Sequence, residues 1–518
     1  MTDFLSFLRT ESYKSGIALS IGFSLLAKLI AFASSLVLAA LFGTSGEMDV
    51  YLYSLFVATL VTSFISALNS SVIIPESMRL AGQSGERQSQ ELVNFFLYAY
   101  AAAGLGIAAV FIPAPAEVFG VISRFDTGVL AGNERLLYSS LPLFPLILVS
   151  TLLADVLASR KYFTVPILAS MANNVFVLFC VLAFHGRLGV FSALLGLCFA
   201  YAAQSVLLLF MLRRRLGWEF GLPSRLPSRK VLGNSLFAQL GQLATAVSAY
   251  VPMFLLSGLD RGTVSAMNYG RQAAEFPNNF ITQQFSAVAG IKLNELFANK
   301  QPGEVDRVVV ASLKGLSFVL VPAALFGAFY SREIIGALFG RGAFGPESVE
   351  SASGFFRLFA LLLPLYAANS IVARLFLSAQ KVREVFWYQI AMNLLLAGLI
   401  VLFVDRFGAL GYPSALLAFY TFSLFSAGFL CAHYFPDVGY WNGVRYLGRI
   451  TAINAVILLF VAEASGRLLP ASPMAAAVLG AIFYFGVLAW ISLRLGINED
   501  FKRVWTGLKG KITGSIGK

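Results

Sequence analysis

The sequence has few charged residues. Asp, Glu, Lys and Arg together make up 12% of the 518 residues, whereas 58% are hydrophobic, and the mean hydropathy is +0.77. A typical soluble domain carries roughly 25% charged residues to keep its surface wet. The composition therefore excludes a soluble enzyme and favours a protein that lies within a bilayer.

Residues that bind metals, form disulfides or hold nucleotide phosphates are also rare. The two histidines, His185 and His433, have no second ligand at a metal-binding spacing. The three cysteines lie far apart within apolar segments. The sequence contains no glycine-rich phosphate loop, which argues against direct coupling to ATP hydrolysis. We therefore expect no cofactor, no metal site and no enzymatic activity. Energy would come from an ion gradient, the membrane potential or the substrate gradient.

Long apolar runs are the main feature of the chain. A helix that crosses ~30 Å of hydrocarbon needs ~20 apolar residues, and lipid admits only helices or closed barrels as spanning structures. The runs have the length of helices and are uninterrupted, which predicts an all-α integral membrane protein with about 14 transmembrane helices. The expected spans are 15–42, 51–74, 91–113, 136–158, 165–186, 188–212, 232–258, 264–290, 308–330, 353–378, 384–405, 411–434, 447–465 and 474–495.

The net charge of +12 gathers in short loops between these runs. Arg9 and Lys14 precede the first span, and the later basic clusters follow every second span, so all fall on one side. Because Lys and Arg favour cytoplasmic loops, we predict a multi-pass protein of a bacterial cytoplasmic (inner) membrane with both termini in the cytoplasm. The charge is then a topological signal, and we expect membrane lipids but no nucleic acid as partners.

The two halves of the chain show a weak internal repeat. The spacing from Lys161 to Asn173 equals that from Lys381 to Asn393, and each pair lies where a basic turn enters a span. A second match joins Gly46, Asp49 and Tyr53 to Gly262, Ser265 and Tyr269. Duplicated transporters show this kind of internal similarity.

The repeat and a basic linker predict the domain organisation. Residues 213–231 form a linker with two prolines and six Lys or Arg side chains near the middle of the chain. We expect two pseudo-symmetric six-helix bundles, 1–212 and 232–434, followed by two additional helices and a tail in 435–518. Such bundles usually bind a substrate between them and rock around it.

Three charged residues inside the predicted spans are candidates for substrate binding. A charge near the bilayer centre costs ~2.5 to 3.5 kcal/mol on insertion scales, so it faces a cavity or a partner. Lys28 lies near the middle of the first span, where it contacts an anionic substrate or pairs with an acid of another helix. Arg271 and Glu275 lie four residues apart in the eighth span and share a face. They either balance each other or contact the substrate.

Two further charges, Asp155 and Arg374, lie near the cytoplasmic ends of the fourth and tenth spans. Each could simply extend its side chain to the interface. They stand six and seven residues before Lys161 and Lys381, so they hold nearly corresponding places in the repeat. We predict that they pair as a cytoplasmic gate when the protein faces outward.

Four segments resemble the MurJ/MviN family of lipid II flippases, part of a superfamily that also holds multidrug exporters and polysaccharide flippases. Leu338–Phe344 (LFGRGAF) is similar to the family's loop before the tenth span. The other segments are Ala39–Tyr51 (AALFGTSGEMDVY), Met267–Pro277 (MNYGRQAAEFP) and Ser159–Pro166 (SRKYFTVP). From residue 20 to about 430, the resemblance implies a V-shaped bundle of 14 helices. It also implies a central cationic cavity, a groove for a lipid tail near the last two spans, and Asp49 as a further candidate for substrate binding.

The sequence departs from the family at several cationic positions. The resemblance implies essential arginines in the first, second and eighth spans. Lys28 matches the earlier basic position of the first span, but the later one falls on Ser34 and that of the second span near Thr62 or Ser63. In the eighth span Gln272 stands at the family's arginine position and Arg271 one residue earlier, a turn of ~100° on a helix. The family's acid cluster for sodium is also missing.

We therefore predict a flippase for a polyprenyl-diphosphate-linked saccharide, which feeds a cell-surface polysaccharide rather than essential peptidoglycan. A diphosphate head group needs cations in a wet cavity, whereas its isoprenoid tail stays in lipid. The alternative is an ion-coupled exporter of drugs or small amphiphiles, for which acidic cavity residues are expected. A membrane glycosyltransferase would need clustered acids in a large loop, and a static scaffold would not need charges inside its spans.

Overall fold

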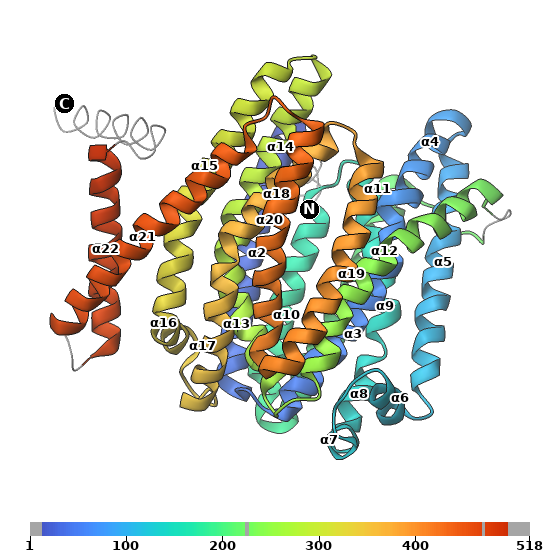
Figure 1. Ribbon diagram of the computed structural model, residues 1–518. Coiled ribbons are helices and arrows are strands. Elements are labelled where there is room, and N and C mark those ends of the chain that lie inside the picture. The colour runs from blue at the N-terminus through green and yellow to red at the C-terminus, as the bar shows by residue number, and fades with distance from the viewer. Residues whose placement is uncertain (1–12, 223–226, 469–471, 496–518) are drawn as a thin grey trace, which may run out of the picture. The chain divides into compact units, whose positions relative to one another are not determined.

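The computed structural model describes residues 13–222, 227–468 and 472–495, and these residues form helices and no strand (Figure 1). The expected all-α membrane fold is confirmed. The chain divides into two compact units. The first comprises the described part of Met1–Ala266 with Arg341–Ser348 and Ile400–Ala409, and the second comprises Met267–Gly340, Val349–Leu399 and the described part of Leu410–Lys518.

The first unit is built on long apolar helices that pack in pairs. Helix α10 packs against α2 and α11, and α9 packs against α3, α5 and α11. A cluster of buried side chains from α5, α9 and α11, among them Leu92, Leu152 and Leu208, forms its core. The elements are α2 (Tyr13–Phe42), α3 (Gly46–Leu68), η1 (Asn69–Ile73), α4 (Ile74–Ser84), α5 (Glu86–Phe111), α6 (Pro115–Val121), α7 (Thr127–Gly132), α8 (Glu134–Ser140), α9 (Leu143–Ser159), α10 (Thr164–Leu188), α11 (Phe191–Leu216) and α12 (Arg229–Leu256).

Helix α13 (Thr263–Pro277) begins in the first unit and continues into the second. The remaining elements are η2 (Asn278–Thr282), α14 (Gln283–Ala298), η3 (Pro302–Glu304), α15 (Val305–Phe329), α16 (Ser331–Phe339), α17 (Pro346–Leu361), α18 (Leu363–Ser378), α19 (Val382–Phe407), η4 (Gly408–Leu410), α20 (Gly411–Tyr434), α21 (Tyr440–Leu468) and α22 (Pro473–Leu495).

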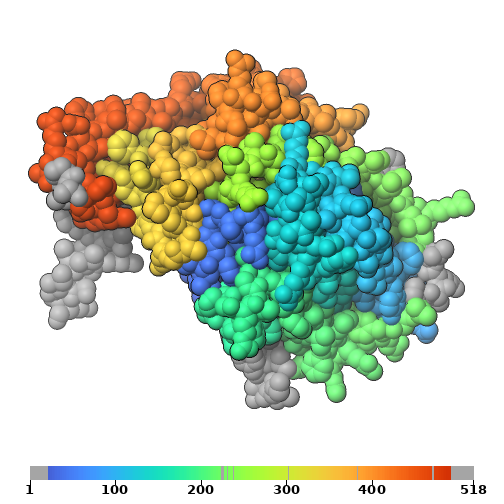
Figure 2. All heavy atoms as spheres, turned by 90° about the horizontal axis from the view of Figure 1, so that it is seen from below, coloured from blue at the N-terminus to red at the C-terminus, as the bar shows by residue number. Residues whose placement is uncertain are grey.

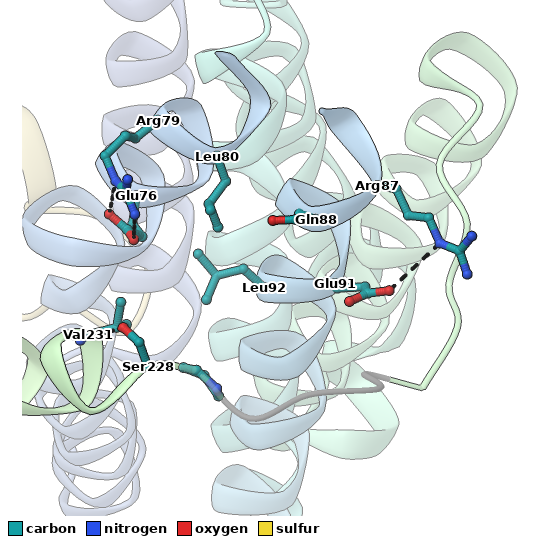
Figure 3. A pocket seen from close by; sticks show the side chains of 10 residues that line it. Glu76, Arg79, Leu80, Arg87, Gln88, Glu91, Leu92, Ser228 and Val231 are labelled. Carbon is teal, nitrogen blue, oxygen red and sulfur yellow. Dashed lines mark hydrogen bonds and ion pairs between the residues drawn. The ribbon is translucent and has the colours of Figure 1, made fainter. Parts of the chain in front are cut away.

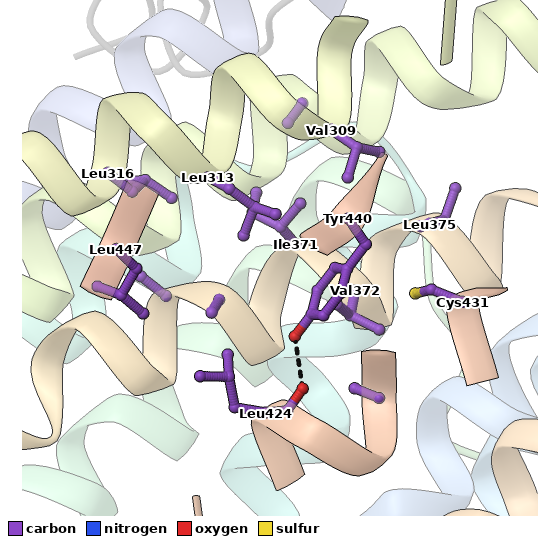
Figure 4. Packing of buried hydrophobic residues seen from close by; sticks show 14 of the residues in the cluster. Val309, Leu313, Leu316, Ile371, Val372, Leu375, Leu424, Cys431, Tyr440 and Leu447 are labelled. Atoms are coloured by element: carbon purple, nitrogen blue, oxygen red, sulfur yellow. Dashed lines mark hydrogen bonds between the residues drawn. The ribbon is translucent and has the colours of Figure 1, made fainter. Parts of the chain in front are cut away.

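The core of the second unit lies where α14, α15, α18, α20 and α21 meet. Leu313 and Leu316 of α15 pack with Ile371 of α18 and Leu447 of α21 (Figure 4). The hydroxyl of Tyr440 donates a 2.8 Å hydrogen bond to the carbonyl of Leu424. A buried phenol needs such a partner, most of all where water is absent. Helix α21 is thus an integral part of this core.

Helix α22 is fixed to α21 by packing and by a buried hydrogen bond. Tyr484 of α22 is fully buried and donates to the Oδ1 of Asn454 at 2.7 Å. Gly480 lets α22 approach closely, because a Cβ at this position would lie 2.5 Å from the hydroxyl of Tyr330. Small residues at such contacts are typical of helix packing in membranes.

The number of helices in the described residues is approximately consistent with the expected 14. Eleven described helices are long and apolar enough to cross a membrane, or twelve with the bent pair α17 and α18 as one span. One of the eleven, Arg383–Tyr434, contains both α19 and α20. The run α13–η2–α14 is not among them, although it has a spanning length. When it is added and α19 and α20 are counted separately, the total is 14.

The ends of α9 and α18 have the same left-handed C-terminal turn. Lys161 has φ +71 and Gln380 has φ +57, and the next residue donates to the carbonyl five positions back, Tyr162 to Leu157 and Lys381 to Phe376. This pattern is a Schellman motif, which satisfies the last carbonyls of a helix. Lys161 therefore corresponds to Gln380, and the pairing of Lys161 with Lys381 taken from the sequence is displaced by one residue at this turn.

Short helices connect α5 to α9 in the first unit. They are α6, α7 and α8, which lie at one end of the long helices (Figure 1). Seen from that end, the cyan segment that contains them covers part of the molecular surface (Figure 2). The hydroxyls of Tyr53 and Tyr250 both donate to the carbonyl of Ile122, which fixes this connection to α3 and α12.

Two segments that resemble the flippase family contact each other in the first unit. The N–H of Ala343 donates to the carbonyl of Ala40 at 2.7 Å, and the hydroxyls of Thr44 and Ser348 are 2.6 Å apart. Gly342 has φ +61, and a Cβ there would collide with the carbonyl oxygen of Ala40. Only glycine fits this position, because the backbone is left-handed and closely approached.

Candidate functional site

A charged and aromatic cluster lies in the second unit, where α13, α18 and α20 contribute side chains. Arg271 and Glu275 of α13 are only partly exposed, at 40% and 33%. Their Nε and Oε1 atoms are 4.0 Å apart, longer than the about 2.7–2.9 Å of a charge-assisted hydrogen bond. The two side chains share a face as predicted, but Glu275 does not occupy the guanidinium directly. The Nε of Arg271 is buried and has no hydrogen-bond partner among the described residues.

Three tyrosines from other helices complete this arginine–tyrosine cluster. Tyr412 at the start of α20 lies within electrostatic range of Arg271. Tyr366 of α18 lies within electrostatic range of Arg271 and Glu275. Its ring meets that of Tyr420 edge to face at 4.6 Å and 89°. The cluster therefore joins a cation, an anion and phenol groups, which can together bind a phosphate and sugar hydroxyls.

Close helix packing fixes the position of Arg271. A Cβ at the preceding Gly270 would lie 2.6 Å from the carbonyl oxygen of Ala352 in α17 and 2.9 Å from the Cβ of Phe355. Helices α13 and α17 thus approach each other at Gly270. On the neighbouring face, Gln272 donates to the Oδ1 of Asn268 at 2.7 Å. Arg271 and Gln272 therefore have different surroundings, as expected from one step of a helix.

Lys28 lies in α2 of the first unit and is half-buried. Its helix packs along α10, and the hydroxyl of Ser34 lies 3.5 Å from the carbonyl oxygen of Asn174 in that helix. Thr62 of α3 is buried and donates to the carbonyl of Ala58 at 2.7 Å. The positions where the resemblance implied further arginines thus hold small hydroxyl side chains that bond to backbone.

Asp49 caps the N-terminus of α13. It is 2% exposed, and its two carboxylate oxygens accept from the N–H groups of Gly262 at 2.6 Å and Ser265 at 2.7 Å. Gly262 directly precedes α13 and Ser265 lies in its first turn, so the carboxylate satisfies free N–H groups at the N-terminus of that helix. The segments matched as a repeat therefore contact each other through Asp49, which positions α13.

Asp155 and Arg374 lie in different units, and their predicted pairing as a gate stays a prediction. In the first unit, the Oδ2 of Asp155 accepts from the amide of Asn69 at 2.8 Å, and Tyr100 donates to the Oδ1 of the same amide at 2.8 Å. In the second unit, the Cδ of Arg374 lies 3.0 Å from where a Cβ of Gly290 would be. Each stands six residues before the left-handed residue that ends its helix.

Two spans contain a turn of π-helix. The first is η1 between α3 and α4, where Asn69 holds Asp155, and the second is η2 between α13 and α14, directly after Pro277. These are the second and the eighth expected spans, which are matching members of the two predicted bundles. Interruptions at matching places in two halves are typical of transporter binding regions.

A cavity of about 900 Å³ lies between α18, α19 and α20 in the second unit. Its apolar wall includes Trp387 and Met392, and Tyr420 connects it to the arginine–tyrosine cluster. Polar side chains also line the cavity. Ser423 donates to the Oδ1 of Asn369 at 2.6 Å, and the hydroxyl of Tyr388 lies 2.9 Å from that of Ser426. A cavity of this size and polarity suits an amphiphilic ligand.

Tyr366, Tyr412 and Tyr420 were not among the site residues expected from the sequence. Their phenol hydroxyls were the available signal, since a hydroxyl inside a span needs a partner. No group of three or more His, Cys, Asp or Glu within the described ranges could hold a metal ion.

Comparison with known families gives a match over most of the chain. The family model described as "Lipid II flippase MurJ" matches residues 38–468. A "Probable lipid II flippase MurJ" of Aquifex aeolicus (strain VF5) is 25% identical over 420 residues, which cover 78% of this chain and 80% of that protein. Another of the same description, from Thermotoga maritima, is 24% identical over 417 residues, 78% of this chain and 82% of that protein.

Solved structures show a similar fold. The structure described as "Lipid II flippase MurJ, inward closed conformation" has a TM-score of 0.74 and 17% identity, and the match covers 93% of this chain and all of that one. An inward-facing multidrug resistance MATE transporter of the MOP superfamily has a TM-score of 0.62 and 14% identity, over 82% of this chain and 96% of that one. These likenesses concern the fold.

Proposed function

The chain belongs to the lipid II flippase MurJ family, and from this premise we propose that it moves a polyprenyl-diphosphate-linked saccharide from the cytoplasmic to the outer leaflet by alternating access. The observation that carries the proposal is the guanidinium of Arg271 in α13, within the eighth span expected from the sequence, with a buried Nε that has no hydrogen-bond partner in the described structure. A diphosphate forms strong charge-assisted hydrogen bonds with such a cation, and these bonds offset the free-energy cost of placing the cation inside a span.

The residues divide into contacts and positioning groups. In the second unit, Arg271 contacts the diphosphate, and the tyrosine hydroxyls with Glu275 contact the saccharide. In the first unit, Lys28 is a contact for the anionic head group. Asp49 is a positioning residue, because both of its oxygens already accept from the backbone of α13. The saccharide belongs to a cell-surface polysaccharide precursor, since Ser34 and Thr62 add no cation and so fit a head group with fewer charged contacts.

A second candidate is an exporter of small amphiphiles. The cavity between α18, α19 and α20 favours it, because about 900 Å³ accommodates a drug-sized molecule. A flippase would bind one end of a lipid, whereas an exporter would enclose its substrate.

The two candidates are separated by transport in proteoliposomes. A fluorescent polyprenyl-diphosphate saccharide is placed in one leaflet, and its transfer is followed by loss of protection from a membrane-impermeant quencher. We expect the chain to accelerate transfer of this lipid and not the efflux of a small cationic dye. Dye efflux without lipid transfer would establish the exporter instead.

A further inference from the structure

A groove between α5 and α11 in the first unit combines an apolar wall with an arginine at one end. Its volume is about 450 Å³. Phe210 in the wall is 54% exposed, which is expected of a side chain that faces lipid. The groove is lined by Leu97, Tyr98, Ala101, Val149, Leu209, Phe210, Arg213 and Phe220.

The linker that follows α11 is held across one end of this groove. Gly217 has φ +59 and reverses the chain. The indole of Trp218 donates to the Oδ1 of Asn94 at 2.9 Å, and the Nδ2 of that amide donates to the carbonyl of Glu219 at 2.7 Å. Tyr98 donates to the carbonyl of Phe220 at 3.1 Å. These bonds from α5 fix Phe220 in the wall, so the groove is a built feature.

The basic residues at this end have no carboxylate partners within the described part of the chain. Arg213, Arg214 and Arg215 end α11, and none of them forms an ion pair with a described residue. Arg214 instead lies over the ring of Phe210, with 5.8 Å from its Cζ to the ring centre.

Three other arginines on the same unit pair with acids, whereas some, among them Arg135 and Arg229, likewise form no ion pair with a described residue. In a neighbouring pocket at the ends of α4 and α5, Arg79 pairs with Glu76 and Arg87 with Glu91 (Figure 3). Arg160 pairs with Glu86 at 2.5 Å. Placement of positive charge in loops for topology explains all of these arginines equally. It does not explain why Arg213, which has no ion-pair partner among the described residues, lines the apolar groove.

We propose that the α5–α11 groove binds one anionic phospholipid of the surrounding bilayer, with an acyl chain along Leu97 and Phe210 and the phosphate on Arg213. An arginine without an ion pair in the wall of an exposed apolar groove matches the two parts of such a lipid. A zwitterionic lipid would bring its own cation against the arginines, and a soluble anion would leave the apolar wall unused. This site is separate from the transport function proposed above.

The proposal is tested by native mass spectrometry of the full chain titrated with phosphatidylglycerol or phosphatidylcholine. We expect tighter binding of phosphatidylglycerol, and Arg213→Gln should weaken it about fivefold. Arg213→Lys keeps the charge and should retain most of the binding. Ala101→Trp fills the groove without a change of charge and should also weaken binding. Arg229→Gln is the matched control, since Arg229 lies on the same unit but outside the groove.

Three results would overturn the site. They are equal binding of both lipids by the unchanged chain, unchanged phosphatidylglycerol binding in Ala101→Trp, and an equal loss in Arg229→Gln and Arg213→Gln. The last would indicate general attraction by surface charge. Size-exclusion profiles and melting temperatures of all variants separate these outcomes from misfolding.

Discussion

Arg271 is held in α13 in a way that leaves part of its guanidinium available. Its helix is fixed against α17 at Gly270, and Tyr412 lies within electrostatic range of its guanidinium. Glu275 lies at 4.0 Å, a distance at which a partly exposed pair contributes little to stability. A phosphate oxygen could therefore bind without breaking a strong native contact.

Replacement of Arg271 should impair transport more than folding. We predict that Arg271→Ala lowers translocation of a polyprenyl-diphosphate saccharide about tenfold to a hundredfold, because a charged hydrogen bond is lost. The amount of folded protein in the membrane should stay normal. Gln272→Ala is the control and should keep its activity, since Gln272 bonds to Asn268 on another face. A large fall in abundance with Arg271→Ala would show that the arginine merely balances Glu275.

The charged residues of the candidate site could be predicted from the sequence, but the residues that surround them could not. Lys28, Arg271 and Glu275 could be singled out because ionisable groups are costly inside apolar spans. The tyrosines around Arg271 come from α18 and α20, roughly 100 to 150 positions later in the chain. No local pattern links them to Arg271. The capping role of Asp49 was hidden for the same reason, since its partners lie in α13.

At the scale of elements, tight loops fix the ends of helices. The Leu338–Phe344 segment, which marks the family resemblance, contacts the loop after α2 through Ala343 and Ala40. The resemblance in both segments therefore has a packing explanation. Their conformation depends on Gly43 and Gly342, which have φ values of +59 and +61.

A side chain at Gly342 should destabilise the protein. We predict that Gly342→Ala lowers stability by about 1 to 3 kcal/mol, because the added Cβ meets the carbonyl oxygen of Ala40 in a left-handed backbone. Gly345→Ala in the same loop has open space around it and should be nearly neutral. Thermal unfolding in detergent, followed by a fluorescent thiol probe, measures both. Equal melting temperatures for the two variants would contradict this account.

The spanning helices could be predicted from the sequence, whereas the residue-by-residue alignment of the internal repeat could not. The spans follow from the lengths of the apolar runs, because lipid forces each run to satisfy its own backbone. The match of Lys161 with Lys381 rested on residue identity, yet the turns superpose Lys161 on Gln380. The left-handed residue at the end of a helix is usually glycine. When it is another residue, as Lys161 and Gln380 are, the sequence does not mark its position.

For the whole molecule, the orientation in the membrane is proposed from the basic loops. The clusters at Arg213 to Arg215, Lys292 and Lys381 all follow even-numbered spans, so one side of the membrane carries most of the positive charge. That side is cytoplasmic by the positive-inside rule. The division into two six-helix bundles and two additional helices likewise remains a prediction.

Cysteine labelling should place the two sides of the membrane. Single cysteines at Gly221 and Gly345, in a background that lacks Cys180, Cys198 and Cys431, should react with an impermeant maleimide from opposite sides. Both glycines have open space for a side chain. Gly342 is unsuitable for this purpose, because it cannot accept a Cβ. Labelling of both cysteines from the same side would contradict a membrane protein with 14 spans.

The central claim is that a cation inside the membrane recognises the diphosphate of a lipid-linked saccharide, and Lys28 tests it most directly. The measurement is translocation of a labelled polyprenyl-diphosphate saccharide in proteoliposomes that contain equal amounts of folded protein. We predict that Lys28→Ala loses translocation by about tenfold or more, because a charged contact made during transfer is removed. Lys28→Arg should retain part of the activity. Full translocation by Lys28→Ala would contradict the claim and favour the exporter of small amphiphiles.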